Sequence, residues 1–398
     1  MKFYARQSID ENDRKAVDDV LQSDHLTQGP SVDAFETALS KFTGAAHAGT
    51  VNSATSALIL AYKAVLSQRG FCQGFGDICE KDGRRASVWV AANTFVSTAS
   101  AARLCGAQVD FIDIDMTSGN MCFDHLTAKL EAAMYPPDIV VPVHFAGVSV
   151  DMKRLAGLAE RFGFDIVEDA AHGLGGLYDN KPIGSCVYSS AAAVSFHAIK
   201  TIATGEGGAV FTDDSHLFEL VEGLKSHGVQ RKKHNNSAQS DSGADWAPWY
   251  YENTALGYNF RMTEIQAALG NSQLDRIETF RTHKINLAQT YRDCFANSPV
   301  MCLLTNDAMS AHHLMPVLLP ENITEMQKID LFNYCRDGGF QFNVHYYPVN
   351  DQPVYADKAG LCPNAMQFYQ REISLPFHMD VKPEQAENFA AHLLSFFA

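Results

Sequence analysis

The sequence predicts an α/β protein with a mostly parallel sheet covered by helices on both faces, followed by a smaller α+β domain. Short apolar runs alternate with helical segments between residues 86 and 212, a pattern typical of parallel sheets. A second mixture of helical and strand patterns occupies the end of the chain. Because the 398 residues exceed the roughly 150 of an average domain, we expect a large domain over residues 1–280 and a small C-terminal domain over residues 281–398.

Each element is predicted from its local pattern, starting at the N-terminus. Residues 10–21 begin with an acidic turn and continue with apolar residues at helical spacing, which predicts a helix. Residues 53–65 are strongly apolar after a hydroxyl-rich start, which predicts a second helix. Strands follow at residues 87–91, 109–114, 139–143, 165–167, 191–195 and 209–212, with helices at residues 97–104, 123–133 and 153–162. After a polar stretch, residues 262–281 are predicted to form one long helix and residues 383–397 a closing amphipathic helix.

Charge and hydropathy exclude several function classes. Thirty-one Lys and Arg residues against 46 Asp and Glu residues give a net charge of −15, which argues against nucleic-acid binding and against docking on anionic membranes. No apolar run approaches the ~20 residues of a membrane-spanning helix, and the first residues lack a signal-peptide pattern. The nine cysteines include no C-x-x-C pair, so reduced thiols and no metal site are expected. Together these observations predict a cytoplasmic protein, in which a local basic pocket for a phosphorylated ligand is still possible.

Two motifs lie where predicted strands and helices meet, which is where parallel sheets bind ligands. VNSATSAL, residues 51–58, places Ser53 and Thr55 at a helix start, where free N–H groups and the helix dipole attract an anion. An ordinary hydroxyl N-cap is the alternative. DIVEDAAHGLGG, residues 165–176, places Asp169 after a buried strand. Asp169 either pairs with a cationic ring nitrogen or is a solvated charge.

A third motif, SFHAIKTIATGEGGAVFT at residues 195–212, contains Lys200 between apolar neighbours. A partly desolvated lysine is neutral often enough to form a Schiff base with an aldehyde. The Gly-rich turn at residues 205–208 precedes a strand rather than opening a helix, and the chain has no G-x-G-x-x-G pattern, so a dinucleotide site is not expected. Three features follow one another along the predicted α/β sheet: a helix start suited to a phosphate, a carboxylate and a lysine. Their order indicates a binding site for pyridoxal 5'-phosphate.

These motifs carry a resemblance that runs nearly end to end. VNSATSAL, ANTFVSTASAA, VEDAAHGLGG, SFHAIKTIATGEGGAV, GYNFRMTEIQAALG and VHYYPV are similar to segments of the DegT/DnrJ/EryC1/StrS family of PLP-dependent nucleotide-sugar aminotransferases. The resemblance implies a fold-type-I, aspartate aminotransferase-like architecture and a homodimer with shared active sites. One relative in that family, the PLP-dependent sugar 3-dehydratases, has histidine in place of the lysine, so Lys200 argues against that activity.

The resemblance also implies roles for individual residues. Lys200 forms the Schiff base and moves the proton, and Asp169 pairs with the pyridine nitrogen. The remaining cofactor-binding residues are Ala54, Thr55, Phe95, His172, Ser195 and, from the neighbouring subunit, Asn259. Arg261 could share or replace the role of Asn259. The segments that line the substrate pocket in similar enzymes contain Thr27, Arg231, His313, His345 and Tyr346; each histidine could equally be a packed imidazole, and Arg231 could be a solvated charge.

Within the family, the likeness is closest to the branch that makes UDP-4-amino-4,6-dideoxy-N-acetyl-β-L-altrosamine for pseudaminic acid. This implies transfer of the amino group of L-glutamate to a UDP-4-keto-6-deoxy-N-acetylhexosamine, for flagellin or surface-glycan modification. Aminotransfer to a bacillosamine, legionaminic acid or perosamine type of 4-keto sugar is the alternative, as is a PLP- or sugar-binding regulator without turnover. Three departures from the branch affect the choice: Ala198 in place of proline, and diverged loops at residues 70–85 and 227–249.

Overall fold

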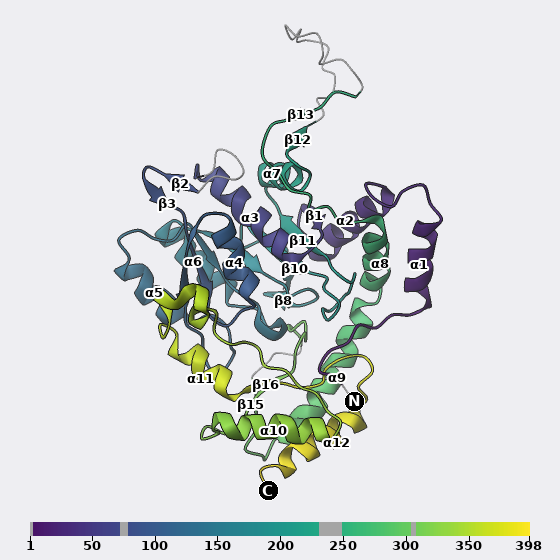
Figure 1. The fold of residues 1–398 in the computed structure, drawn as a ribbon, viewed down its shortest axis with the longest axis vertical. Coiled ribbons are helices and arrows are strands. Elements are labelled where there is room, and N and C mark those ends of the chain that lie inside the picture. The colour runs from purple at the N-terminus through teal and green to yellow at the C-terminus, as the bar shows by residue number, and fades with distance from the viewer. Residues whose placement is uncertain (1–2, 72–78, 231–248, 304–307) are drawn as a thin grey trace.

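The computed structural model describes residues 3–71, 79–230, 249–303 and 308–398. A seven-stranded sheet runs through the larger part of the molecule in the order β1-β11-β10-β7-β6-β4-β5 (Figure 1). Its strands are β1 (His47–Val51), β4 (Ser87–Ala91), β5 (Gln108–Ile112), β6 (Ile139–Val141), β7 (Asp165–Asp169), β10 (Ala191–Ser195) and β11 (Gly208–Thr212). All neighbours from β10 to β5 pair in parallel, whereas β11 is antiparallel to both of its neighbours. The mostly parallel sheet expected from the sequence is confirmed.

Helices cover both faces of this sheet because the strand side chains alternate between two cores. One face packs against α3 (Ala54–Gln68), α4 (Val96–Leu104) and α7 (Ser215–Lys225). The opposite face packs against α5 (Phe123–Ala132) and α6 (Met152–Phe162) over one half, and against α2 (Pro30–Thr43) and α8 (Glu264–Leu274) over the other. In β4, for example, Val88 and Val90 pack into the core that contains α3, which we call the first core, and Trp89 packs on the opposite face toward α5 and α6.

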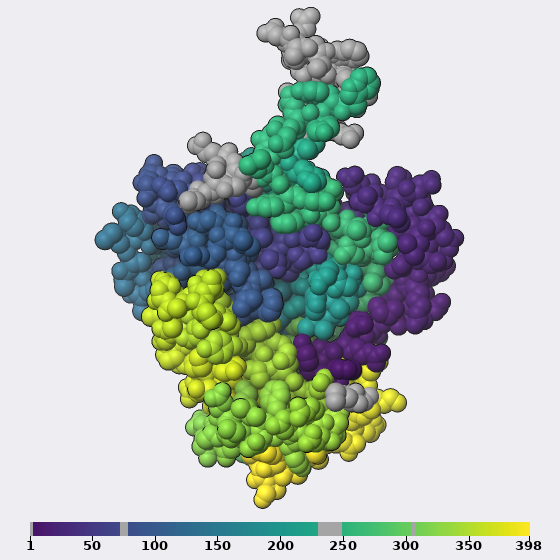
Figure 2. All heavy atoms as spheres, in the orientation of Figure 1, coloured from purple at the N-terminus to yellow at the C-terminus, as the bar shows by residue number. Residues whose placement is uncertain are grey.

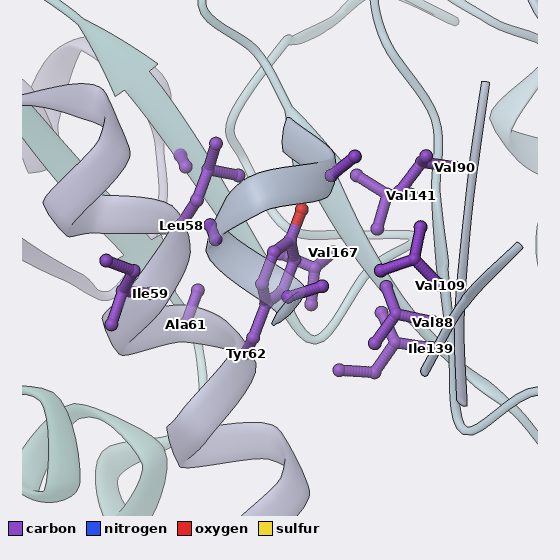
Figure 3. Packing of buried hydrophobic residues seen from close by; sticks show 14 of the residues in the cluster. Leu58, Ile59, Ala61, Tyr62, Val88, Val90, Val109, Ile139, Val141 and Val167 are labelled. Atoms are coloured by element: carbon purple, nitrogen blue, oxygen red, sulfur yellow. The ribbon is translucent and has the colours of Figure 1, made fainter. Parts of the chain in front are cut away.

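Helix α3 is buried on nearly every side and anchors the first core. Figure 3 shows Leu58 and Tyr62 of α3 beside the strand residues Val88, Val141 and Val167. Tyr62 is fully buried, and its hydroxyl donates to the backbone oxygen of Thr98 at 3.2 Å. A buried hydroxyl needs such a partner. The middle of α3 is therefore fixed against the central strands.

A second, smaller core lies toward the C-terminus. The helices around it are α9 (Ile277–Phe295), α10 (Glu325–Asp337) and α12 (Pro383–Ser395), and its sheet has the strands β14 (Met301–Cys302), β15 (Pro316–Leu318) and β16 (Glu372–Ser374). Helix α11 (Pro363–Arg371) instead packs Ala365 and Phe368 into the core that contains α3. Ile277 and Phe280 of α9 pack into the large core, whereas Leu287 and Tyr291 of the same helix pack into the small one. We propose a division into two domains near residue 280, within α9.

The N-terminal segment lies against the C-terminal part of the chain. The backbone N–H of Phe377 donates to the oxygen of Tyr4 at 2.9 Å, and Arg6 forms an ion pair with Asp380 at 2.9 Å. Figure 2 shows the purple N-terminal atoms in contact with the green and yellow C-terminal part. Short hairpins complete the strands: β2 (Glu80–Lys81) with β3 (Arg84–Arg85), β8 (Leu177–Tyr178) with β9 (Lys181–Pro182), and β12 (Val229–Gln230) with β13 (Glu252–Asn253).

The structure corrects the prediction of one helix over residues 262–281. The segment is divided into α8, which ends at Leu274, and α9, which begins at Ile277. Arg276, between them, has φ −104° and ψ 4°, outside helical geometry. Its side chain turns toward α1 (Glu11–Leu21), where it forms ion pairs with Asp10 and Asp13. A local apolar pattern cannot reveal these contacts, which span more than 260 positions of the sequence.

The Arg276 contact predicts a stability effect. Asp13 is fully buried and also accepts hydrogen bonds from Ser272 and Gln273, each at 2.7 Å. Replacing Arg276 with methionine leaves this carboxylate without its cation, so we expect Arg276→Met to lower the free energy of unfolding by about 3 kcal/mol. Urea denaturation measures the change. The exposed pair Lys15–Asp19 supplies the control, since Lys15→Met should lower the free energy of unfolding by less than about 1 kcal/mol. Equal decreases for the two variants would contradict a special role of the buried ion pair.

Two further sequence expectations concern cysteines and membranes. Among the cysteines that the structure describes, seven are free thiols, but Cys79 is disulfide-bonded, so the expectation of reduced thiols throughout is wrong at this residue. The absence of a C-x-x-C pair excludes no disulfide, because bonding requires only that two Cα atoms approach within about 7 Å. Within the described ranges, no helix combines the length and the apolarity that crossing a membrane requires.

Candidate active site

A cavity of about 490 Å³ opens at the carboxyl ends of β7 and β10, as expected for a parallel sheet. Its walls come from the starts of α3 and α4, the segment after β10 and residues 343–346. The cavity brings together most of the residues that the sequence singled out: Ala54, Thr55, Phe95, Asp169, His172, Ser195, Lys200, His345 and Tyr346. A helix start, a carboxylate, a lysine and two imidazoles therefore share one enclosed space.

Asp169 ends β7 and is 5% exposed. Oδ2 accepts a hydrogen bond from Thr98 Oγ1 at 2.6 Å, and Oδ1 accepts one from the backbone N–H of Ala171 at 3.1 Å. Thr98 lies in the first turn of α4, and the hydroxyl of Thr94, just before this helix, lies 2.6 Å from the Thr98 hydroxyl. These bonds fix the orientation of a carboxylate that lines the cavity.

Lys200 lies five residues after β10 and lines the same cavity. Burial lowers the pKa of Lys200 to about 8, although the negative charge of Asp169 acts in the opposite direction. Near neutral pH roughly one molecule in ten therefore has a neutral amine at this position, compared with fewer than about one in a thousand for an ordinary lysine. A neutral amine can act as a nucleophile or as a proton acceptor.

The start of α3 forms one end of the cavity. Ser53 is the N-cap and accepts a hydrogen bond from the backbone N–H of Ser56 at 3.1 Å, so the N-cap alternative is correct for this residue. Ala54 and Thr55, the first two residues of the helix, line the cavity together with Ser195. Since the first N–H groups of a helix have no partner within it, they are available to an anion here.

Gly208 gives this end of the cavity its shape and predicts a further effect. A Cβ at Gly208 would lie 2.7 Å from both the backbone nitrogen of Ala54 and the carbonyl carbon of Ser53, which the rigid helix start cannot avoid. We expect Gly208→Ala to displace the start of α3, to weaken phosphate-dependent cofactor retention at least about tenfold, and to lower the melting temperature. Equilibrium dialysis of the cofactor measures the first effect. Gly223→Ala, which points into open space, should leave retention unchanged; equal retention in both variants would contradict the role assigned to Gly208.

His172 forms the inner wall of the cavity. Its Nε2 lies 3.1 Å from the hydroxyl of Tyr346, and its Nδ1 is buried without a hydrogen-bond partner among the described residues. Burial, together with the positive charge of Lys200, lowers the pKa of His172 well below its ordinary value, so the ring is neutral. His313 packs behind it with ring centroids 4.3 Å apart and does not itself line the cavity.

Three expected site residues that the structure describes do not line the cavity: Thr27, Asn259 and His313. Thr27 and Asn259 are exposed and are not part of the cavity wall of this chain. Arg231 lies outside the described residues. Sequence reasoning missed Thr98, Tyr4 and Asn343, which hold Asp169 or line the cavity. A local signal for Thr98 was the spacing of four positions from Thr94, whose hydroxyl lies 2.6 Å from that of Thr98 although Thr94 precedes α4.

The cavity fits the cofactor that the sequence indicated. It has a helix start for a phosphate, a fixed carboxylate for a ring nitrogen, a lysine with a lowered pKa, and a buried Nδ1 atom of His172 that lacks a partner. Buried polar atoms are normally paired, so this nitrogen indicates a missing polar group. Among the described residues, no cluster of His, Cys, Asp or Glu has the arrangement of a metal site.

Known proteins similar to this chain include aminotransferases, which agrees with the residues gathered in the cavity. Residues 7–394 match the DegT/DnrJ/EryC1/StrS aminotransferase family. The chain is 34% identical over 393 residues to the spore coat polysaccharide biosynthesis protein SpsC of Bacillus subtilis, covering 97% of this chain and 94% of that protein. It is 32% identical over 392 residues to a UDP-4-amino-4,6-dideoxy-N-acetyl-β-L-altrosamine transaminase of Campylobacter jejuni, covering 97% and 95%.

Solved structures agree with the fold along the whole chain. Helicobacter pylori PseC, an aminotransferase involved in pseudaminic acid biosynthesis, superposes with a TM-score of 0.86 at 32% identity, covering 100% of this chain and 99% of that one. A putative sugar aminotransferase of Streptococcus pneumoniae in its PLP form, at 24% identity, has the same fold with a TM-score of 0.85, covering 100% and 98%. The fold-type-I architecture is thereby confirmed, and the chain belongs to the DegT/DnrJ/EryC1/StrS aminotransferase family.

Proposed function

We propose that this enzyme uses pyridoxal 5'-phosphate to move the amino group of L-glutamate to the 4-keto carbon of a UDP-linked 2-acetamido-2,6-dideoxy-hexos-4-ulose. The product is UDP-4-amino-4,6-dideoxy-N-acetyl-β-L-altrosamine, on the pseudaminic acid route. The observation that carries the aminotransferase chemistry is the presence of Lys200 and Asp169 in one cavity that ends at a helix start. The choice of sugar is supported by the likeness to the C. jejuni altrosamine transaminase and to the H. pylori aminotransferase of pseudaminic acid biosynthesis.

The residues divide the chemistry between them. When bound, pyridoxal 5'-phosphate supplies an aldehyde that bonds amines and a ring that delocalises negative charge. Lys200 Nζ bonds the cofactor and, once free, accepts and returns a proton. Asp169 presents its fixed carboxylate to the ring nitrogen, oriented by Thr98. Ala54, Thr55 and Ser195 hold the phosphate, while Phe95 and His172 enclose the ring.

Residues beyond this cavity are assigned to the partner subunit and to the sugar nucleotide. The exposed Asn259 pairs with Ser226 in a β-bridge near the foot of the hairpin β12–β13, which projects from the body (Figure 1). An exposed residue there is suited to reach the phosphate site of a second copy, so we assign a homodimer. His345 and Tyr346 contact the sugar, and Thr27, His313 and Arg231 belong to the wider substrate pocket.

The lowered pKa of Lys200 predicts the pH dependence of cofactor capture. Because only the neutral amine bonds the cofactor, the rate at which apoprotein takes up pyridoxal 5'-phosphate should rise about tenfold per pH unit below the pKa and level off above about 8. Stopped-flow absorbance records this rate. Asp169 raises the pKa of Lys200, so Asp169→Asn should move the plateau to lower pH. A rate that still rises above pH 9 would contradict the assigned environment.

Two absorbance experiments test the proposed reaction. L-Glutamate should convert the long-wavelength band of the purified holoenzyme to the shorter-wavelength band of pyridoxamine phosphate. Candidate UDP-, dTDP- and GDP-linked 4-keto-6-deoxy sugars should then restore the first band at rates that rank them as substrates. A holoenzyme that glutamate leaves unchanged would be a binding protein, and fastest recovery with another sugar isomer would replace the substrate named above.

A further inference from the structure

A chain of buried hydrogen bonds leads from the cavity wall into the small core. His345 lines the cavity, and Ser374 and Glu372 of β16 lie behind it. His345 Nδ1 lies 2.7 Å from Ser374 Oγ, and Ser374 Oγ lies 2.6 Å from Glu372 Oε1. The backbone N–H of His345 donates to Glu372 Oε2 at 2.6 Å. His345 is 4% exposed, and the other two residues are fully buried, so solvent does not compete for these bonds.

The His345 ring holds a single proton. Burial and the positive charge of Lys200 lower the pKa of His345 to about 3, so the imidazole is neutral and one of its two nitrogens carries hydrogen. The hydrogen bond made by one nitrogen decides which of them that is. Nδ1 faces Ser374, whereas Nε2 lies 3.5 Å from Nδ2 of Asn343, another residue of the cavity wall. The state of Nδ1 therefore determines what Nε2 offers to the cavity side.

The direction of the hydrogen bonds depends on the proton of Glu372. In its ionised form, both carboxylate oxygens accept, so the Ser374 hydroxyl donates to Glu372 and its oxygen accepts from Nδ1–H. Nε2 is then an acceptor. When Glu372 is protonated at Oε1, it donates to Ser374, the hydroxyl donates to Nδ1, and Nε2 carries the hydrogen as a donor. The backbone N–H of His345 keeps Oε2 an acceptor in both states.

We propose that Glu372, acting through Ser374, sets which nitrogen of His345 carries the proton, and hence whether this part of the cavity wall donates or accepts a hydrogen bond. A donor at Nε2 suits the oxygen of a ketone or a carboxylate, and an acceptor suits a sugar hydroxyl. Glu372 and Ser374 are thus positioning residues. The consequence for substrate choice rests on the proposed function, but the tautomer itself does not.

Both states of Glu372 are accessible. Burial raises the pKa of Glu372 to about 8, while its hydrogen bonds to Ser374 and to His345 N–H and the nearby charge of Lys328 of α10 act in the opposite direction. Burial in turn lowers the pKa of Lys328, whose Nζ donates to the backbone oxygen of Tyr369 at 2.5 Å. The carboxyl group therefore loses its proton at a higher pH than an ordinary glutamate, and a glutamine in its place imitates the protonated form.

The test is the tautomer of His345, measured by two-bond ¹H–¹⁵N NMR of ¹⁵N-histidine-labelled holoenzyme. The His345 signal is assigned by its absence from His345→Gln. At about pH 9.5, roughly 1.5 units above the pKa of Glu372, the wild-type proton should be on Nδ1. In Glu372→Gln the amide oxygen must accept from His345 N–H, so the amide N–H donates to Ser374, and the proton should move to Nε2. A proton on Nε2 in the wild type, or on Nδ1 in Glu372→Gln, would overturn the proposal.

Controls separate this effect from damage and from the proposed reaction. Glu321→Gln, a matched change at an 86% exposed side chain, should leave the tautomer as in the wild type. Ser374→Thr keeps the hydroxyl, so the His345 proton should stay on Nδ1. Ser374→Ala removes the hydroxyl, so His345 should lose its preference for Nδ1–H, and an unchanged Nδ1–H in this variant would overturn the proposal. These two variants test the proposal if Glu372→Gln does not fold. Failure of L-glutamate to convert the cofactor would refute the proposed function but would leave this NMR result intact.

Discussion

Lys200→Ala should abolish turnover, with a loss of about 10⁴-fold or more, because one amine both bonds the cofactor and moves the proton. The variant should bind pyridoxal 5'-phosphate without the long-wavelength band, and L-glutamate should produce no catalytic conversion. Lys200 lines the cavity together with Asp169, and its pKa is lowered to about 8. Burial also lowers the pKa of Lys284 and of Lys328, but neither of these lysines lines the cavity. Absorbance spectra before and after L-glutamate measure both effects.

Two controls distinguish loss of the amine from loss of charge or fold. Lys200→Arg keeps a positive charge beside Asp169 but has no amine that can become neutral, so it should be as inactive as Lys200→Ala. Lys181→Ala, at an exposed position of β9, should retain the band and the wild-type rate. Activity within about tenfold of the wild type in Lys200→Arg would show that charge, rather than amine chemistry, explains the need for this residue.

Asp169→Asn has the second-largest expected effect. The amide has the same shape as the carboxylate but no charge, so it cannot stabilise a protonated ring nitrogen, and we expect kcat to fall about 10²–10³-fold. Thr98 should continue to hold the side chain in place, since its hydroxyl can donate to the amide oxygen. Rates of the glutamate half-reaction, followed by absorbance, measure the loss separately from sugar binding.

The strand that carries Asp169 also supplies the control. Asp165 lies at the opposite end of β7, where it pairs with Arg69 at 2.7 Å, so Asp165→Asn tests the same chemical change away from the cavity and should leave kcat unchanged. Thr98→Val removes one hydrogen bond from Asp169 and should cost about tenfold. Equal losses in Asp169→Asn and Asp165→Asn would mean that strand stability, rather than charge in the cavity, matters.

Patterns confined to a few residues predicted much of this fold. The strands at residues 87–91 and 191–195 were predicted with their correct bounds, because continuous apolar runs bounded by turns are typical of buried parallel strands. Strand β1 was missed, since HAGTV is short and includes glycine and histidine. The antiparallel direction of β11 was also missed, because strand direction depends on the path of the connecting segment and not on the composition of the strand.

Local sequence patterns also predicted only some of the side chains of the site. Asp169 and Lys200 were found because each stands in a motif whose chemistry depends on neighbours in the sequence. Sequence patterns did not reveal Thr98, Ser374 or Glu372. Thr98 forms its hydrogen bond with Asp169, 71 positions away. Ser374 and Glu372 form theirs with His345, 29 and 27 positions away. Such contacts become visible only when the chain is folded.

The N-terminal segment has a consequence for the order of folding on the ribosome. Tyr4 lines the cavity, and its neighbours Phe3 and Arg6 are held by His378 and Asp380, across 375 and 374 positions of sequence. Contacts of such separation form late, because more than 370 residues are synthesised between the two partners. The sheet of the large domain can form while translation continues, but this part of the cavity wall is completed only after His378 and Asp380 have been synthesised.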